Sequence, residues 1–188
     1  MTISTQNVSG LAEFSRRTDI EESPAWEFQN GNASQKPMPG LQHSRLQGRL
    51  AGRINLHCQG FEALPELRCT VRGRSLVPDL VILPDTDIPV DESGRVSAKG
   101  IEFVPPWVVE ILSPEQSSIQ VTRKILFLLR CGTQLGWLID PGEQVVLVFQ
   151  PDGLPEEFVG ETNLPMLAGV DLTLTAAEMF GWLKGEKR

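Results

Sequence analysis

The sequence has no tyrosine, only three cysteines and only two histidines among its 188 residues. Cys58, Cys69 and Cys131 are odd in number and lack Cys-x-x-Cys spacing, which favours reduced thiols over a disulfide framework or a zinc site. No apolar run approaches the length that spans a membrane. The first thirty residues lack the charged start and apolar stretch of a secretory signal. The sequence therefore predicts a cytoplasmic protein without membrane contact.

The sequence also lacks an excess of positive charge. Its 17 Lys and Arg residues are outnumbered by 24 Asp and Glu residues, and the formal net charge at pH 7 is -7. This balance argues against a broadly basic nucleic-acid surface, although it leaves room for local basic patches. With 40% hydrophobic residues, the chain can bury a substantial core. Its length predicts a single domain, which we place at residues 23–188, after a flexible N-terminal arm at residues 1–22.

Two short apolar runs each carry one acidic residue. Residues 108–114 read Val-Val-Glu-Ile-Leu-Ser-Pro, and residues 76–83 read Leu-Val-Pro-Asp-Leu-Val-Ile-Leu. Runs of this length and composition predict buried strands, with Pro78 interrupting the second or limiting it to pairing on one side. An ionised carboxylate in such a strand is costly unless a cation, a hydrogen bond or a proton compensates it. Asp79 and Glu110 therefore indicate a divalent-metal site.

The remaining patterns predict elements around these two strands. Asn-Gly at residues 30–31 predicts a tight hairpin, and Asp-Pro-Gly at residues 140–142 predicts another. Helical periodicity predicts helices over residues 41–57 and 119–131, and a short helix over residues 176–183. Because the acid-bearing strands are apolar on both faces, we expect them to be central and covered on both sides.

The helix over residues 41–57 presents two further groups of polar residues. His43 and Gln47 project close to its apolar stripe, so both are expected to face inward. His43 is then either a hydrogen-bonded histidine at a helix start or part of a site. Three arginines spaced four residues apart form a row on the neighbouring flank, which is either a solvated face or a phosphate-contacting stripe: Arg45, Arg49 and Arg53.

Lys124 lies within the apolar arc of the helix predicted over residues 119–131. Arg123 and Arg130 lie together on the opposite side, which is the natural solvent face. A lysine in the apolar arc either extends its ammonium to solvent along the apolar surface or reaches a cavity that contains the two carboxylates.

The ordered set of these motifs resembles the Uma-two family of bacterial nucleases, a branch of the PD-(D/E)XK, or restriction-endonuclease-like, superfamily. The resemblance covers residues 25 to 183 and implies an α/β (α+β) fold, with a restriction-endonuclease-like core whose central mixed β-sheet is flanked by helices, and with an N-terminal β-hairpin. Gln120 stands where the family often has an acid, and Leu128 where it often has Tyr. The matching pieces are residues 26–31, His43, residues 77–81, residues 108–114, Lys124 eight residues before Gly132, and residues 136–141.

The resemblance implies a Mg²⁺- or Mn²⁺-dependent endonuclease that acts on nucleic acid, with DNA as the expected substrate. Asp79 and Glu110 would hold the metal. Lys124 would take the part of the lysine that the superfamily usually carries two residues after the glutamate, where this chain has Leu112. The catalytic residues implied are thus Asp79, Glu110 and Lys124, with His43, Gln47 and Glu27 as candidates for lining the site and Arg45, Arg49 and Arg53 as candidates for phosphate contacts.

Two other functions stay open at this point. A catalytically weak or inactive nuclease-fold module that binds nucleic acid or protein agrees with the acidic net charge. A metal hydrolase for a small phosphorylated substrate is the second, and a homodimer is also open.

One expectation concerns the stability of the metal-free protein. Two carboxylates on adjacent buried strands repel each other, so the pKa of one or both should be raised without metal, and Asp79→Asn should stabilise the metal-free protein.

Overall fold

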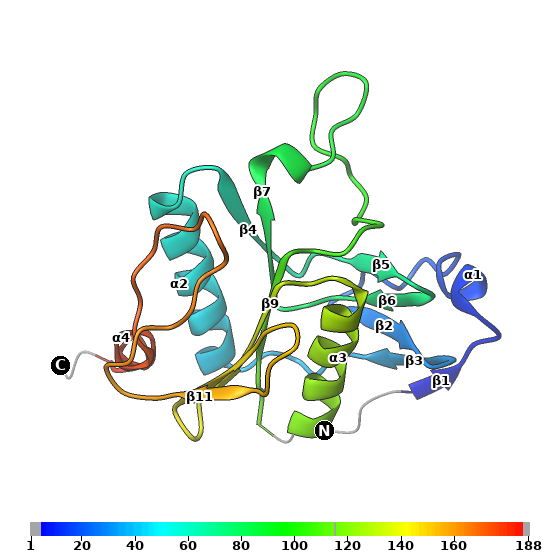
Figure 1. Cartoon of the computed structure of the whole chain (residues 1–188). Helices are drawn as coiled ribbons and strands as arrows, with labels where there is room; N and C mark the ends of the chain where they lie inside the picture. The colour runs from blue at the N-terminus through cyan, green and yellow to red at the C-terminus, as the bar shows by residue number, and fades with distance from the viewer. Residues whose placement is uncertain (1–4, 115, 186–188) are drawn as a thin grey trace.

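The structure is a computed structural model that describes residues 5–114 and 116–185, and within them it contains two β-sheets (Figure 1). The larger sheet has the strand order β11 (Glu156–Phe158), β10 (Val145–Phe149), β9 (Leu135–Asp140), β8 (Trp107–Ile111), β7 (Leu80–Pro84) and β4 (Phe61–Pro65). The smaller sheet has the order β1 (Thr5–Asn7), β3 (Asn32–Gln35), β2 (Trp26–Gln29), β6 (Arg74–Leu76) and β5 (Cys69–Val71). The helices are α1 (Leu11–Phe14), α2 (Leu41–His57), α3 (Ser118–Cys131) and α4 (Ala176–Gly181), with a 3-10 turn, η1, at Asp85–Asp87.

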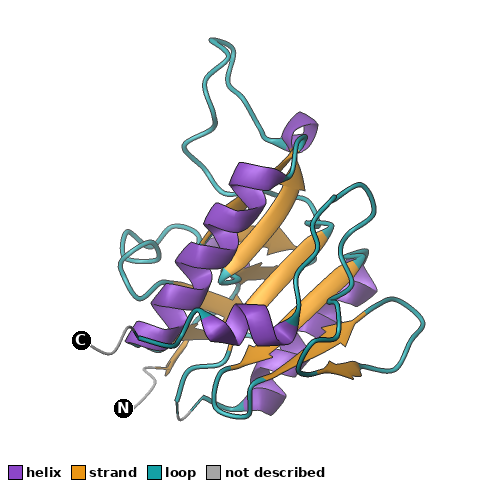
Figure 2. Cartoon of the chain, turned by 90° about the vertical axis from the view of Figure 1, so that its left-hand side faces the viewer, coloured by secondary structure: helices purple, strands orange, loops and turns teal. Residues whose placement is uncertain are grey.

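The larger sheet is mixed and carries helices on both faces. β8 and β9 pair in parallel, whereas the other neighbouring strands pair antiparallel. α2 lies across one face (Figure 2), where Leu50 and Ile54 join a core with Trp107 and Trp137. α3 covers the other face, and its Ile125 packs there in a second cluster. This arrangement confirms the fold class expected from the sequence.

The segment at residues 76–83 differs from the single strand that its composition predicts. Leu76 ends β6 in the smaller sheet, and Leu80 begins β7 in the larger sheet. Residues 77–79 cross between the sheets, which agrees with the interruption expected at Pro78, since proline cannot donate to a strand ladder. Asp79 therefore lies at a backbone break between two sheets rather than in the middle of a strand.

Local signals explain where the other elements begin and end. The Asn30-Gly31 turn joins β2 and β3, and both residues have the positive φ that this kind of hairpin requires. Ser117 accepts a hydrogen bond from Gln120 N at the start of α3, and Gly132 follows its last residue with a φ of 123°. Thr175 caps α4 in the same way as Ser117 caps α3. None of the described helices combines the length and apolar character needed to cross a membrane.

The N-terminal arm expected over residues 1–22 is built into the smaller sheet over part of its length. β1 pairs antiparallel with β3, with Thr5 opposite Ser34. Phe14 is fully buried, and its ring centroid lies 5.5 Å from that of Phe28. Residues 5–14 therefore do not form the loose arm that their polar composition suggests, because one aromatic side chain anchors them. Residues 1–4 of the arm and residues 186–188 of the expected domain lie outside the described residues, and the boundary between residues 22 and 23 stays a prediction.

Candidate active site

The pairing of β7 with β8 brings the two predicted acids together. Leu80 pairs with Val109, so the residue before Leu80 lies beside Glu110. The backbone N–H of Ile111 donates a 2.6 Å hydrogen bond to Asp79 Oδ2. Both acidic residues are almost completely buried, with exposed fractions of 3% for Asp79 and 2% for Glu110. The two apolar runs therefore place two carboxylates side by side in the interior.

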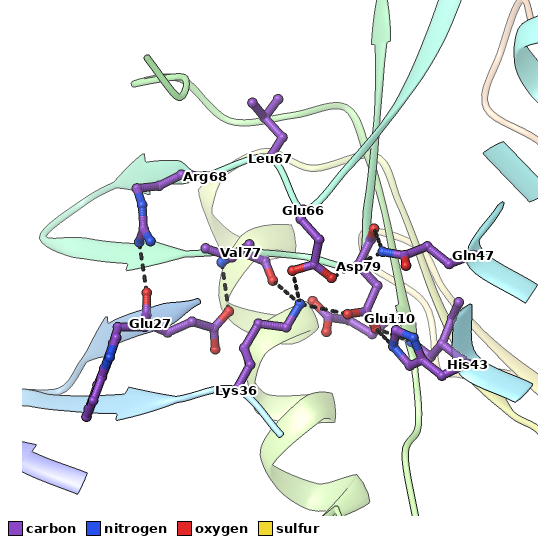
Figure 3. A network of polar contacts seen from close by, with 12 residues as sticks. Glu27, Lys36, His43, Gln47, Glu66, Leu67, Arg68, Val77, Asp79 and Glu110 are labelled. Atoms are coloured by element: carbon purple, nitrogen blue, oxygen red, sulfur yellow. Dashed lines mark hydrogen bonds and ion pairs between the residues drawn. The ribbon is translucent and has the colours of Figure 1, made fainter. Parts of the chain in front are cut away.

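Asp79 is held by positively polarised groups on several sides (Figure 3). Lys36 Nζ lies 2.7 Å from Asp79 Oδ1, and His43 Nε2 lies 3.1 Å from Oδ2. Burial raises the pKa of Asp79, but the Lys36 ammonium and the hydrogen bond from His43 outweigh burial and hold this pKa well below its usual range. The expectation that one or both acids have a raised pKa is therefore met by Glu110, whose pKa rises to about 8, and not by Asp79.

Lys124 reaches the carboxylates from α3. Its ammonium lies 2.8 Å from Glu110 Oε1 and 2.5 Å from Glu27 Oε1, and it donates a 3.1 Å hydrogen bond to the carbonyl of Val77. Burial lowers the pKa of Lys124, but Glu110, Glu27 and Asp79 outweigh burial and raise it above its ordinary value. The side chain is only 5% exposed, so it does not extend to solvent. Of the two interpretations of this lysine, the structure supports the one in which it reaches the acids.

The pKa of Glu110 is shifted in the opposite direction from that of Asp79. Burial raises its pKa to about 8, and the neighbouring charge of Asp79 adds to this rise while Lys124 opposes it. Four carboxylates contact the two ammonium groups of the cluster: Asp79 and the partly exposed Glu66 lie beside Lys36, and Glu27 and Glu110 lie beside Lys124. This excess of negative charge adds to the effect of burial, so the raised pKa favours the protonated form of Glu110 at neutral pH, and an added cation would oppose that preference.

The donor set of this cluster fits a hard divalent cation. Glu110 Oε1 is buried and accepts no hydrogen bond of good geometry, despite its short distance to Lys124. Mg²⁺ is commonly bound through one or two carboxylates and retains several waters. In residues 5–114 and 116–185, no group of three or more His, Cys, Asp or Glu side chains is arranged to hold a metal. Asp79 and Glu110 are two neighbouring carboxylates of the kind that such an ion binds, and their assignment as metal ligands stays a prediction.

Two small cavities open onto the cluster, and Lys36 lines both. The first, of about 200 Å³, is also lined by His43, Gln47 and Asp79. Gln47 Nε2 donates a 2.8 Å hydrogen bond to the carbonyl of Asp79, so this side chain fixes the backbone at the break. The second cavity, of about 240 Å³, is lined by Glu27, Glu110 and Lys124. His43, Gln47 and Glu27, which the sequence offers as lining residues, all lie beside the acids.

The arginine row lies away from these cavities. Arg45 and Arg49 are exposed on α2. Arg53 Nη2 lies 3.1 Å from Glu178 Oε1 on α4. None of the three lines either cavity that reaches the two acids. Their contact with phosphates stays a prediction.

The sequence did not predict two of the residues at this site, Lys36 and Glu66. Lys36 Nζ donates to the carbonyl of Val77 at 2.9 Å and to Glu66 Oε2 at 2.8 Å, in addition to its contact with Asp79. Lys36 directly follows β3, and no periodicity marks it as buried. The one signal in the sequence is its place just after the hairpin that carries Glu27.

The two departures from the family pattern occupy different surroundings. Gln120 is exposed and lines the second cavity, beside Lys124. Leu128 is fully buried in an apolar cluster with Val108. Neither residue replaces one of the carboxylates or lysines of the cluster.

The chain matches both a known protein family and solved structures. The sequence profile of the Uma2 family, described as "putative restriction endonuclease", matches residues 11–177. Among solved structures, the chain is similar to the crystal structure of "a putative nuclease belonging to DUF820" from Anabaena variabilis ATCC 29413, with a TM-score of 0.88 and 38% sequence identity. The match covers 93% of this chain and 99% of that chain. No curated protein matches the sequence significantly.

Proposed function

Because the chain belongs to the Uma2 family, whose members are described as putative restriction endonucleases, we propose that it is a metal-dependent endonuclease that hydrolyses phosphodiester bonds in DNA. The observation that carries the proposal is the buried pair of Asp79 and Glu110, which Lys124 contacts from the following helix. The nuclease description of the solved relative supports the same class of activity.

Asp79 and Glu110 are the residues that would hold Mg²⁺ or Mn²⁺. When bound, such an ion polarises the scissile phosphate and lowers the pKa of an attacking water. Lys36, His43 and the N–H of Ile111 keep the Asp79 carboxylate ionised and oriented, which supports this role, although a metal would have to displace part of these contacts. Glu110 would supply the second carboxylate, and binding of a cation there would lower its raised pKa and release its proton.

Lys124 would act on the charge that develops on the phosphate during hydrolysis. Its ammonium is preorganised by Glu27, Glu110 and the carbonyl of Val77. It also lines the 240 Å³ cavity, through which a phosphate can approach. Groups fixed in this way need no reorganisation when charge develops, which is why the loss of one typically costs about 10²–10³ in rate. His43, Gln47 and Glu27 would position these groups rather than react.

Cleavage assays with a substrate panel test the proposal. Supercoiled plasmid, single-stranded DNA and RNA are incubated with the wild type in Mg²⁺, in Mn²⁺ and in chelator. We expect metal-dependent cleavage of DNA that Lys124→Met reduces by about 10²–10³. The matched control is Lys184→Met, the same change at an exposed lysine that follows α4, which should cleave like the wild type. Equal rates for wild type and Lys124→Met would contradict the proposal.

A binding module without catalysis is the second candidate function. It is favoured by the full set of partners on Asp79, whose two oxygens already contact Lys36, His43 and Ile111 N. A metal has to compete with these groups for the carboxylate. Salt-dependent DNA binding without cleavage in either metal would support this alternative and reject the nuclease.

A further inference from the structure

The 240 Å³ cavity at Glu110 and Lys124 continues into a larger one of about 690 Å³. We name the two together the α3 groove. Thr5, Gln29, Ser34 and Gln120 line both cavities, so the two spaces share a boundary. One wall of the groove is α3, and the other is the edge of the smaller sheet at β1, β2 and β3, which Figure 1 shows beside this helix. The groove thus leads from the protein surface to the candidate active site.

The outer part of the α3 groove is basic in a protein that is acidic as a whole. Arg74, Arg123 and Arg130 line it, and its described lining contains no Asp or Glu. Among the described residues, none of these three arginines is paired with a carboxylate. The chain has seven more acidic than basic residues, so a stretch with three arginines and no acid stands out from its average surface. Such a local concentration of positive charge attracts a polyanion.

Arg74 is also held at the groove by two contacts of its guanidinium. The guanidinium carbon of Arg74 lies 3.8 Å from the ring centroid of Phe127, and Arg74 Nη2 donates a 2.7 Å hydrogen bond to Asn30 Oδ1. Arg123 and Arg130 are exposed and lie seven residues apart on α3, which places them two turns apart on the same side. The two residues are therefore about 10 Å apart along the helix, so one strand of DNA that follows the groove can contact both.

The alternative basic surface, the row on α2, lacks this connection. Arg53 is already paired with Glu178, and none of Arg45, Arg49 and Arg53 lines a cavity that reaches Glu110. Neither cavity at the cluster therefore connects the arginine row on α2 to Lys124.

We propose that a DNA strand binds along the α3 groove, with its phosphates on Arg74, Arg123 and Arg130 and with its path continuing to Lys124. This inference rests on the proposed nuclease function and adds the route of the substrate. Gln120 lies where the two cavities meet, and its neutral amide leaves that junction free of negative charge. An acid at this position would repel the backbone of the strand.

The test compares two matched pairs of substitutions. Arg123→Gln/Arg130→Gln removes two exposed arginines from α3, and Arg45→Gln/Arg49→Gln removes two exposed arginines from α2. Binding of a fluorescent oligonucleotide, as single strand and as duplex, is measured by anisotropy in chelator over a range of salt concentrations. Because all four side chains are exposed, each variant should keep the stability of the wild type to within about 0.5 kcal/mol, which thermal melts check.

We expect the α3 pair to flatten the dependence of log K on log salt by about 0.7 per lost contact on the single strand, or about 0.9 on the duplex. The α2 pair should leave the slope unchanged, and Gln120→Glu should weaken binding. An unchanged slope for the α3 pair, or an equal loss for the α2 pair, would overturn the inference. If the wild type still cleaves DNA in that case, the nuclease stands and the route is wrong. If the wild type neither cleaves nor binds DNA, the proposed function itself fails.

Discussion

Replacement of Asp79 by asparagine gives a sharp test of the electrostatics in the site. The substitution keeps the size of the side chain and removes its charge. Asp79 accepts from three donors, the Lys36 ammonium at 2.7 Å, Ile111 N at 2.6 Å and His43 Nε2 at 3.1 Å. An asparagine has one accepting oxygen, so its NH₂ group must face at least one of these donors. We therefore expect Asp79→Asn to destabilise the metal-free protein, which reverses the expectation drawn from the repulsion of two carboxylates alone.

The size of this effect follows from what the substitution leaves behind. Removing one partner from a buried ion pair costs about 3–5 kcal/mol, because the other charge stays buried without compensation. Relief of the repulsion between Asp79 and Glu110 acts in the opposite direction, but it does not restore a partner to Lys36. For a protein of this length, 1 kcal/mol shifts the melting temperature by about 2–4 °C, so a fall on the order of 10 °C is expected.

Thermal melts in chelator at pH 7 measure this fall. Asp85→Asn, which changes an exposed aspartate on η1, is the control and should melt within about 0.5 kcal/mol of the wild type. A double variant, Asp79→Asn with Lys36→Met, should lose less stability than the sum of the single losses, since each removes the other's partner. If Asp79→Asn melts at or above the wild type, repulsion between the acids dominates and our account of Lys36 is wrong.

Three further predictions concern stability in chelator. The pKa of Glu110 is raised to about 8, from about 4.3 in an unfolded chain, so the wild type should lose stability relative to Glu110→Gln as the pH rises from 5 to 8. The difference should grow by at most about 1.4 kcal/mol per pH unit. A difference in urea-denaturation free energy that stays constant over this pH range would contradict the prediction. Gly136→Ala should lower the free energy of unfolding by about 1–3 kcal/mol, since an added Cβ would lie 2.5 Å from Ile125 Cγ2. Its control, Gly52→Ala on the open, exposed side of α2, should raise the free energy of unfolding by about 0.5–1 kcal/mol. If urea denaturation shows Gly136→Ala to be the more stable of the two, the close approach of α3 to β9 is refuted. Phe14→Ala should cost about 3–5 kcal/mol, and a melting temperature equal to that of the wild type would restore the interpretation of residues 5–14 as a loose arm.

Local patterns in the sequence predict most helices and strands, because caps, turns and apolar periodicity act over a few residues. The Asn30-Gly31 hairpin and the Ser117 cap of α3 are examples in which the signal and the element coincide. Residues 76–83 show where such patterns stop being informative. Their apolar composition is continuous, but β6 pairs with β2 and β5 whereas β7 pairs with β4 and β8. Partners distant in the sequence decide that division, so no window of neighbouring residues contains it.

The candidate site shows the same limit. Glu110 and Lys124 could be singled out because a charged residue in an apolar pattern is costly and needs a partner. Lys36 could not, because it follows a polar strand and becomes buried only when the break at residues 77–79 packs over it. Its absence from the prediction also explains why the sequence could not tell which of the two acids has the raised pKa. Without Lys36, two adjacent carboxylates are expected to repel, whereas in the complete cluster Lys36 stabilises the charge of Asp79 and the pKa of Glu110 is the one that rises.

The rate of DNA cleavage by Glu110→Gln, measured beside the wild type in saturating Mg²⁺, decides whether the Asp79–Glu110 pair is the active site. The substitution keeps the shape of the side chain and removes the carboxylate that would bind the ion. Its control is Glu157→Gln, which makes the same change on the exposed edge strand β11. Our account predicts that Glu110→Gln lowers the rate by about 10²–10³ or more, while Glu157→Gln cleaves like the wild type. Equal cleavage by wild type and Glu110→Gln, with both proteins folded, would contradict the assignment of the active site to the Asp79–Glu110 pair.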